Sequence, residues 1–212
     1  LGYCYAWKGD FQKALEALDR YREIDRTANA FDSLGDAYMH AGDYEKAAEM
    51  KRQALQLDPS MFYARRNLIY IDILCGRYAE AERQLNSFLT KSFLDNSQKA
   101  QVYAALAYLD YRKGDFGSVV SLCKQGLGLL GGAQYDERKD ELIWLEGSAE
   151  LARNNLTGAR AVLAKLRGVV DTNSINAMNF KPVYKFWLLL SMQMLAKEGD
   201  KAEAVKAAND LE

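Results

Sequence analysis

The chain has few of the side chains on which catalytic and metal sites depend. Its 212 residues include one histidine, His40, and three cysteines, Cys4, Cys75 and Cys123, with no C-x-x-C pair. Most acid–base, nucleophilic and zinc sites need several such residues together. We therefore expect no enzyme activity, no cofactor and no metal. We expect the cysteines to be small buried side chains and His40 to be a solvated turn residue.

Several other features are also scarce. Only two prolines interrupt the chain, which suits long helices. Lysine and arginine number 28 against 29 aspartates and glutamates, net −1, so the basic excess of a general nucleic-acid binder is missing. No apolar run is long enough to cross a bilayer. Three cysteines without a disulfide framework favour a reducing compartment, so we expect a cytoplasmic protein. The helical pattern is already under way at Leu1, which predicts that the chain was cut from something longer.

A repeated phrase is present instead. Gly, then Asp (Arg77 in the third copy), then an aromatic, then a small residue three positions later occurs at 9–14, 42–47 and 76–81. A more divergent form, with Asn in place of Gly in one copy, occurs at 114–119, 154–159 and 199–204. A spacing of 33 to 45 residues between copies predicts stacked supersecondary units. Glycine suits a left-handed helix end, and Asp caps the helix that follows. Each copy therefore predicts the short turn of an antiparallel helical hairpin.

Periodicity of apolar residues extends this prediction to six hairpins. First helices are expected at about 1–8, 28–41, 60–75, 97–113, 136–153 and 182–198, and second helices at about 11–25, 44–57, 78–92, 116–130, 156–170 and 201–211. Pro59 is expected to be the first residue of the third first-helix, with Asp58 as its cap. Longer connections are expected at 93–97, 131–135 and 171–181. We predict one domain, 1–212, regular over 1–95 and divergent over 96–212.

One known family has this pattern. Residues 28–61 carry Phe31, Leu34-Gly35, Tyr38, Gly42-Asp43-Tyr44, Ala47, Ala54 and Pro59, and with them resemble a tetratricopeptide repeat (TPR). The resemblance is close to about residue 90 and holds in outline beyond. The family has an aromatic where this chain has Lys51, so we expect Met50 to fill that space. The resemblance implies an all-α, right-handed superhelical solenoid of about six antiparallel helical hairpins.

The resemblance also implies a binding surface, because the first helix of each hairpin lines the concave side in this family. The matching positions are Asn29, Asp32, Asp36 and Met39, then Tyr63, Arg66, Asn67 and Tyr70, then Gln101, Tyr108, Tyr111 and Arg112, then Glu141, Trp144 and Ser148. Tyr, Trp and Arg dominate binding hot spots. We therefore expect a protein–protein interaction scaffold that binds a peptide or partner segment in this groove, with Tyr70, Tyr108 and Trp144 as anchors. The alternative is that several of these aromatics have a purely structural role and pack between repeats.

The charges on this surface restrict the partner. Asp32 and Asp36 stand where chaperone-tail binders of the family have Lys and Asn, and Gln101 and Ala105 stand where they have Lys and Arg. Acid in place of base would repel a carboxylate tail. An acidic second unit and a basic third unit predict instead an extended peptide with a basic residue followed by an acidic one.

Three alternatives remain at this point. The chain could be a regulatory or sensor segment of a larger signalling protein, such as a transcription regulator or kinase, binding its own effector domain or a small ligand. It could self-associate through the apolar segment 183–195. Residues 126–131 spell G-x-G-x-x-G, but a dinucleotide site needs that phrase between a strand and a helix, and the prediction here is the end of a helix.

Overall fold

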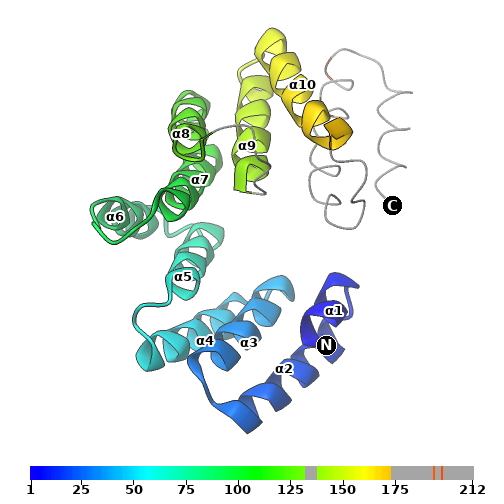
Figure 1. Cartoon of the computed structure of the whole chain (residues 1–212), viewed down its shortest axis with the longest axis vertical. Helices are drawn as coiled ribbons and strands as arrows, with labels where there is room; N and C mark the ends of the chain where they lie inside the picture. The colour runs from blue at the N-terminus through cyan, green and yellow to red at the C-terminus, as the bar shows by residue number, and fades with distance from the viewer. Residues whose placement is uncertain (132–137, 173–192, 194–196, 198–212) are drawn as a thin grey trace. The chain divides into compact units, whose positions relative to one another are not determined.

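The computed structural model describes residues 1–131 and 138–172, together with Gln193 and Lys197 (Figure 1). All regular secondary structure in these ranges is helical. The helices are α1 (Gly2–Trp7), α2 (Phe11–Asp25), α3 (Ala28–His40), α4 (Tyr44–Leu57), α5 (Phe62–Leu74), α6 (Tyr78–Leu89), α7 (Asn96–Lys113), α8 (Phe116–Leu129), α9 (Arg138–Ala152) and α10 (Leu156–Thr172). The predicted all-α class of paired helices is confirmed over this part of the chain.

Within the described residues, five copies of the repeated phrase form hairpin turns as predicted, and the copy at 199–204 lies outside these residues. Glycines 9, 42, 76 and 114 have φ between 78° and 82°, and Asn154 has φ 61°. These left-handed positions are ones that a residue with a Cβ rarely adopts, apart from Asn. The carboxylates of Asp10, Asp43 and Asp115 each accept a backbone N–H three residues later, at 3.1–3.2 Å. The turn sequence therefore ends one helix and begins the next.

The start of the third hairpin differs from the prediction. Helix α5 begins at Phe62 rather than at Pro59, and its N-cap, Met61, makes no side-chain cap hydrogen bond. Asp58 instead ends α4, and its Oδ1 accepts both the N–H and the hydroxyl of Ser60, at 2.9 and 2.6 Å. Asp58 is engaged in this local turn, so it cannot cap a helix at Pro59. At the other end of the described chain, α10 continues to Thr172, two residues into a predicted loop.

The chain divides into two compact units, unit 1 (Leu1–Gln84) and unit 2 (Leu85–Glu212). In unit 1, alanines with no exposed surface lie where the helices of a hairpin meet, at Ala14, Ala47 and Ala81. Small residues at these contacts allow close helix approach and leave space for larger side chains between hairpins. Leu18 and Leu34 fill one such space, together with half-buried Tyr38 and Met50.

Unit 2 has its own core, formed by α7, α8 and α9. Its buried members include Ala104, Val119, Cys123, Leu142, Leu145 and Ala149. Gly126 is part of this contact, since a Cβ there would lie 2.9 Å from Cδ1 of Leu142. Residues 126–131 are thus the end of α8 and its turn, as expected, and Gly126 serves helix packing.

The remaining expectations on cysteine and histidine have a mixed outcome. His40 is exposed at the end of α3, as predicted, and Cys123 is buried. Cys4 and Cys75 are exposed, so the prediction that they are buried was wrong. Cys75 fails because it caps α5 beside the glycine turn, where the chain is at the surface. The predicted hairpin of 182–198 and 201–211 and the segment 183–195 lie outside the described residues, apart from Gln193 and Lys197. No described helix has the length and apolarity needed to cross a bilayer.

Candidate functional site

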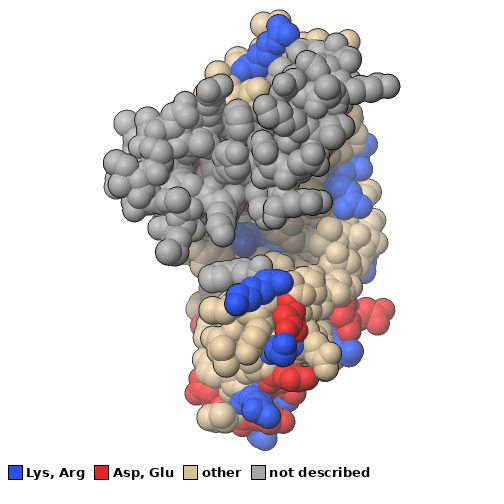
Figure 2. All heavy atoms as spheres, turned by 90° about the vertical axis from the view of Figure 1, so that its right-hand side faces the viewer, with Lys and Arg blue, Asp and Glu red and all other residues tan. Residues whose placement is uncertain are grey.

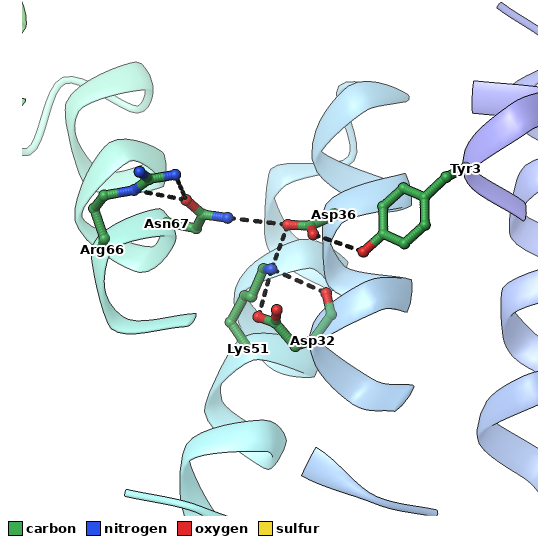
Figure 3. A network of polar contacts seen from close by, with 6 residues as sticks. All are labelled: Tyr3, Asp32, Asp36, Lys51, Arg66 and Asn67. Carbon is green, nitrogen blue, oxygen red and sulfur yellow. Dashed lines mark hydrogen bonds and ion pairs between the residues drawn. The ribbon is translucent and has the colours of Figure 1, made fainter. Parts of the chain in front are cut away.

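A network of polar side chains joins three of the predicted binding residues to two that were not predicted. Asp32 and Asp36 project from α3, and Asn67 from α5, as expected for first helices. Lys51 of α4 and Tyr3 of α1 complete the group (Figure 3). In this view Asp36 stands between Tyr3 and Asn67, and Lys51 reaches it from the second helix. The network therefore connects all three hairpins within unit 1.

Lys51 is the centre of this network. Its side chain has no exposed surface, and its Nζ donates to Asp32 O at 2.9 Å, to Asp32 Oδ1 at 2.6 Å and to Asp36 Oδ1. An ammonium has three donors, so all three are used. The stem of Lys51 lies against Gly35, whose hypothetical Cβ would be 3.0 Å from Cε of the lysine. The space expected for Met50 is thus filled by Lys51 itself, which hides a hydrocarbon stem and places its charge on two carboxylates.

Asp36 has no unused acceptor oxygen. Its Oδ1 accepts from Lys51 and from Asn67 Nδ2, the latter at 3.0 Å, and its Oδ2 accepts the Tyr3 hydroxyl at 3.0 Å. Beyond Asn67, the Nε and Nη2 of Arg66 lie 3.4 and 3.2 Å from the Asn67 amide oxygen. A carboxylate that receives three donors is held firmly in place and offers little to an additional donor.

The electrostatics of the network follow from this geometry. Burial raises the pKa of Asp32, and the positive charge of Lys51 opposes the rise. Burial and the negative charge of Asp36 raise the pKa of Tyr3 to about 12, against a hydrogen bond with Ser33 that lowers it. With Lys51 and Arg66 positive and Asp32 and Asp36 negative, the four formal charges cancel. The acidic pole that the sequence predicts at the second hairpin is therefore balanced from inside unit 1.

The remaining predicted residues of α5 form an aromatic–cation stack. The Cζ of Arg66 lies 5.3 Å from the ring centroid of Tyr63 and 5.7 Å from that of Tyr70. Spacings of three and four residues place all three side chains on one face of the helix. Tyr63 is 54% exposed, whereas Arg66 and Tyr70 are half-buried. Stacking on two rings restrains the guanidinium plane in one orientation.

Two predicted residues of unit 1 lie apart from this network. Asn29 is exposed at the start of α3 and donates its amide N–H to the hydroxyl of Tyr21 at 3.2 Å. Met39 is half-buried and packs against Ala47 and Ile71. Figure 2 shows acidic and basic side chains interspersed over the part of the molecule that holds the first hairpins. We name the surface made by α1, α3 and α5 of unit 1, including Tyr63, Arg66 and Tyr70, the first-helix face.

The predicted residues of unit 2 serve mainly as packing. Tyr108, Tyr111 and Trp144 lie against the α7–α9 core, and the Tyr111 ring centroid is 6.5 Å from that of Trp144. Arg112 is exposed, donates to the Tyr108 hydroxyl at 3.3 Å and stacks on that ring. Gln101 is buried. This packing agrees with the alternative interpretation, in which these aromatics have a structural role. On α9, Glu141 is half-buried and Ser148 is buried.

Lys51 and Tyr3 were not predicted from the sequence as members of the site. A signal for Lys51 did exist, because this lysine occurs in the buried stripe of α4 between Ala47 and Ala54, where only apolar residues are expected. A lone lysine there requires a buried carboxylate, and the pair on α3 supplies two. Tyr3 had no comparable signal. Within the described residues, no three His, Cys, Asp or Glu side chains are grouped as metal ligands.

Comparison with known proteins agrees with the geometry. A family model described as tetratricopeptide repeat matches residues 38–107. No curated protein matches the chain. Among solved structures, a tetratricopeptide repeat protein from Parabacteroides merdae is 16% identical, with 100% of this chain and 75% of that one covered and a TM-score of 0.71.

Two further solved structures are similar in fold. Pseudomonas aeruginosa pilF is 17% identical, covering 100% of this chain and 87% of that one, with a TM-score of 0.58. A chain of the APC/C hetero-tetramer Cut9–Hcn1 is 16% identical, covering 99% and 41%, with a TM-score of 0.64. At these identities the likeness is one of fold. The family model thus identifies a tetratricopeptide repeat over residues 38–107, and the described helices have the fold of tetratricopeptide-repeat structures.

Proposed function

We propose that this chain is a protein–protein interaction scaffold that holds an extended segment of a partner protein against the first-helix face of unit 1. The tetratricopeptide-repeat fold supports protein–protein interaction in general, and the similarly folded Cut9–Hcn1 chain belongs to a hetero-tetramer. The proposal keeps the expectation that the chain is not an enzyme. Neither the described contacts nor the comparisons favour a sensor segment of a signalling protein.

One observation carries the proposal, the stack of Tyr63, Arg66 and Tyr70 on α5. Tyr and Arg are the residue types in which binding energy is concentrated. Stacking fixes the guanidinium before a partner arrives, so less side-chain entropy is lost on binding. Tyr63 exposes more than half of its surface beside a half-buried arginine, which gives one apolar and one charged contact side by side.

The network around Lys51 supports this arrangement. Asn67 lies next to Arg66 in sequence, accepts its N–H groups, and is itself bonded to Asp36 of α3. The helix that carries the stack is thereby fixed to the preceding hairpin by polar contacts as well as by packing. A binding surface on packed helices is held more precisely than one on loops. In unit 2, the exposed Arg112 on Tyr108 is a second, smaller contact of the same type.

The experiment uses the whole chain and a phage-displayed library of random 12-residue peptides. Peptides that are enriched on the wild-type chain are synthesised, and their affinities are measured for Tyr63→Ala and for Leu57→Ala. Leu57 is the matched control, because it is 56% exposed at the end of a second helix. We expect about a 10-fold loss for Tyr63→Ala and no more than about 2-fold for Leu57→Ala. Equal effects of the two changes, or no enriched peptide at all, would contradict the proposed face.

A further inference from the structure

The first hairpin of unit 1 has a recess between α1 and α2, with a volume of about 230 Å³, which we call the α1–α2 recess. Six residues line it: Leu1, Tyr5, Lys13, Glu16, Ala17 and Arg20. Among the described helices, α1 and α2 pack on each other and on α3. Leu1 exposes 84% of its surface, and Lys13, Glu16 and Arg20 are exposed too. Over the part of the chain that the structure describes, the recess is therefore open to solvent.

The second hairpin carries an equivalent surface 33 residues further along the chain. Tyr38 occupies the position of Tyr5, and Lys46 that of Lys13. The Nζ of Lys46 lies 5.4 Å from the ring centroid of Tyr38, and the Nζ of Lys13 lies 5.8 Å from that of Tyr5. Each lysine also pairs with the aspartate that caps its helix, at 2.8 Å for Lys46 and 2.6 Å for Lys13. Sequence and geometry agree that the two hairpins present the same kind of surface.

In the second hairpin this surface is covered by a helix. Leu34, Tyr38 and Met50 pack there in one apolar cluster. The cluster is completed by a stripe of side chains from α2, formed by Leu15, Leu18 and Tyr21. Spacings of three residues place such side chains along one side of a helix. The structure thus contains an example of what covers a surface of this kind, namely the apolar side of an amphipathic helix.

The recess itself arises from a difference between the two hairpins. Ala17 stands where the second hairpin has Met50, whereas Leu1 matches Leu34 and Tyr5 matches Tyr38. The methionine side chain extends well beyond the Cβ at which alanine ends. The first hairpin therefore keeps the apolar residues of the contact and leaves space where the methionine would be. A large apolar side chain that enters from outside gains hydrophobic burial and dispersion contacts there.

We infer that the α1–α2 recess is a docking site for an amphipathic helix of a partner protein. The helix presents an apolar stripe with the spacing of Leu15, Leu18 and Tyr21, and one of its side chains, larger than leucine, enters beside Ala17. A helix laid into an apolar groove is a recurring mode of recognition. The inference goes beyond the proposed function, because it uses another surface and another kind of segment. A second copy of the chain cannot lend its own α2 stripe, since that stripe is packed against α3.

The test uses the whole chain and three helical peptides as probes. The parent peptide has the sequence of residues 10–26, which include α2, with blocked ends and a side-chain crosslink on its polar side. The other two carry Leu15→Trp or Leu18→Trp. Fluorescence anisotropy gives the Kd of each. Because the recess is larger than its covered equivalent, we expect the wild-type chain to bind one tryptophan peptide at least about 5-fold more tightly than the parent.

Two variants of the chain locate the contact. Ala17→Met restores the residue of the second hairpin and should reverse the order, so that the parent peptide binds at least about 5-fold more tightly than either tryptophan peptide. Ala17→Glu places a charge in the recess and should weaken the tightest peptide about 10-fold or more. Gln56→Glu adds the same charge at an exposed position of α4 and is the matched control, with an expected change of no more than about 2-fold. Circular dichroism verifies that each variant is folded.

Each outcome bears on the inference. Absence of binding for all three peptides at about 1 mM, a Kd unchanged by Ala17→Glu, or the same peptide order on wild type and Ala17→Met would overturn it. If Ala17→Glu is unfolded, the order on Ala17→Met decides. A dimer in light scattering that Ala17→Glu dissociates would assign the recess to a second copy instead of a partner helix.

The proposed function is tested separately by Tyr63. Tyr63→Ala should leave the Kd of the helical peptides within about 2-fold of wild type, because Tyr63 lies on α5 and does not line the recess. A large loss in that variant would place the helical peptides on the first-helix face and refute the assignment to the recess. Library peptides that do not depend on Tyr63 would refute the proposed function and leave the recess as the binding site.

Discussion

Replacement of Lys51 by methionine removes one charge and keeps most of the volume of the stem. Methionine fills the space beside Gly35, so the change isolates the ammonium and its three hydrogen bonds. Asp32 and Asp36 are then left facing a buried space without a cation. We expect the free energy of unfolding of unit 1 to fall at pH 7 by ~2–4 kcal/mol.

The magnitude follows from the exposure of the two carboxylates. Removing one partner of a fully buried ion pair costs ~3–5 kcal/mol, because the other charge stays buried and uncompensated. Here the aspartate side chains are 12% and 19% exposed, so water reaches them and reduces the loss. Asp36 also keeps its bonds from Tyr3 and Asn67. These two effects place the expected value somewhat below the range for a buried pair.

The loss should depend on pH, and its sign can be worked out. Burial already raises the pKa of Asp32, and Lys51 opposes the rise, so the lysine's removal raises that pKa further. A carboxyl group with a raised pKa in the folded state favours folding below its unfolded pKa of ~3.9. That contribution is lost as the pH rises through the folded pKa. The destabilisation by Lys51→Met should therefore be smaller at pH 4–5 than at pH 7.

Urea unfolding followed by circular dichroism at both pH values measures the effect, and hydrogen exchange of α3 and α4 amides assigns it to unit 1. The triple variant Lys51→Met/Asp32→Asn/Asp36→Asn is the control, because it removes the stranded charges together with the lysine. It should recover at least half of the loss. A loss below ~1 kcal/mol, equal losses at the two pH values, or no recovery in the triple variant would refute a buried ion pair at this position.

Three further predictions test other parts of the chain. Gly35→Ala places a Cβ 3.0 Å from Cε of the fixed Lys51 and should lower the free energy of unfolding by ~1–3 kcal/mol. Gly128→Ala, with nothing within 4 Å of its Cβ, should raise it by about 0.5 kcal/mol. A higher free energy of unfolding for both variants in urea would contradict the close packing at Gly35. Asp115→Ala removes the acceptor at the start of α8 and should cost ~1 kcal/mol in the same assay, and an unchanged midpoint would argue against the cap. Because burial raises the pKa of Tyr3 to about 12, the stability contributed by its phenol is present below pH ~10 and lost as the pH rises through about 12. In an ultraviolet titration, the tyrosinate absorbance that wild type has in excess of Tyr3→Phe should appear near pH 12, and an excess with its midpoint near pH 10 would refute this.

Much of the fold could be predicted because its turns are encoded locally. A glycine that must adopt positive φ and an aspartate that caps the next helix occupy two adjacent positions, so the turns beginning at Gly9, Gly42 and Gly114 could be located from sequence alone. The start of α5 could not, because Asp58 can either cap a helix or close a turn with Ser60. Both uses employ the same side chain, and tertiary packing decides between them.

The candidate site was only partly predictable, for a different reason. Helical periodicity predicts which side of α3 carries Asp32 and Asp36. Whether their charge is available to a partner depends on Lys51, which lies on another helix. The exposure of Cys75 has a different, local cause, because this residue caps α5 beside the turn at Gly76. Sequence patterns fix the position on one helix well and contacts between helices poorly.

Several residues together accommodate Lys51 at a position where the tetratricopeptide-repeat pattern has an aromatic. An aromatic ring needs no acceptor, whereas an ammonium in the same space needs three, and here the Asp32 carbonyl and the carboxylates of Asp32 and Asp36 provide them. Gly35 leaves room for the lysine stem, because any Cβ there would crowd it. The two acidic residues that seemed to be the signature of a binding surface are thus explained first by the core of their own hairpin. Charge on a first helix of such an array can be assigned to partner recognition only after the facing positions of the second helix have been examined for a buried residue of opposite sign.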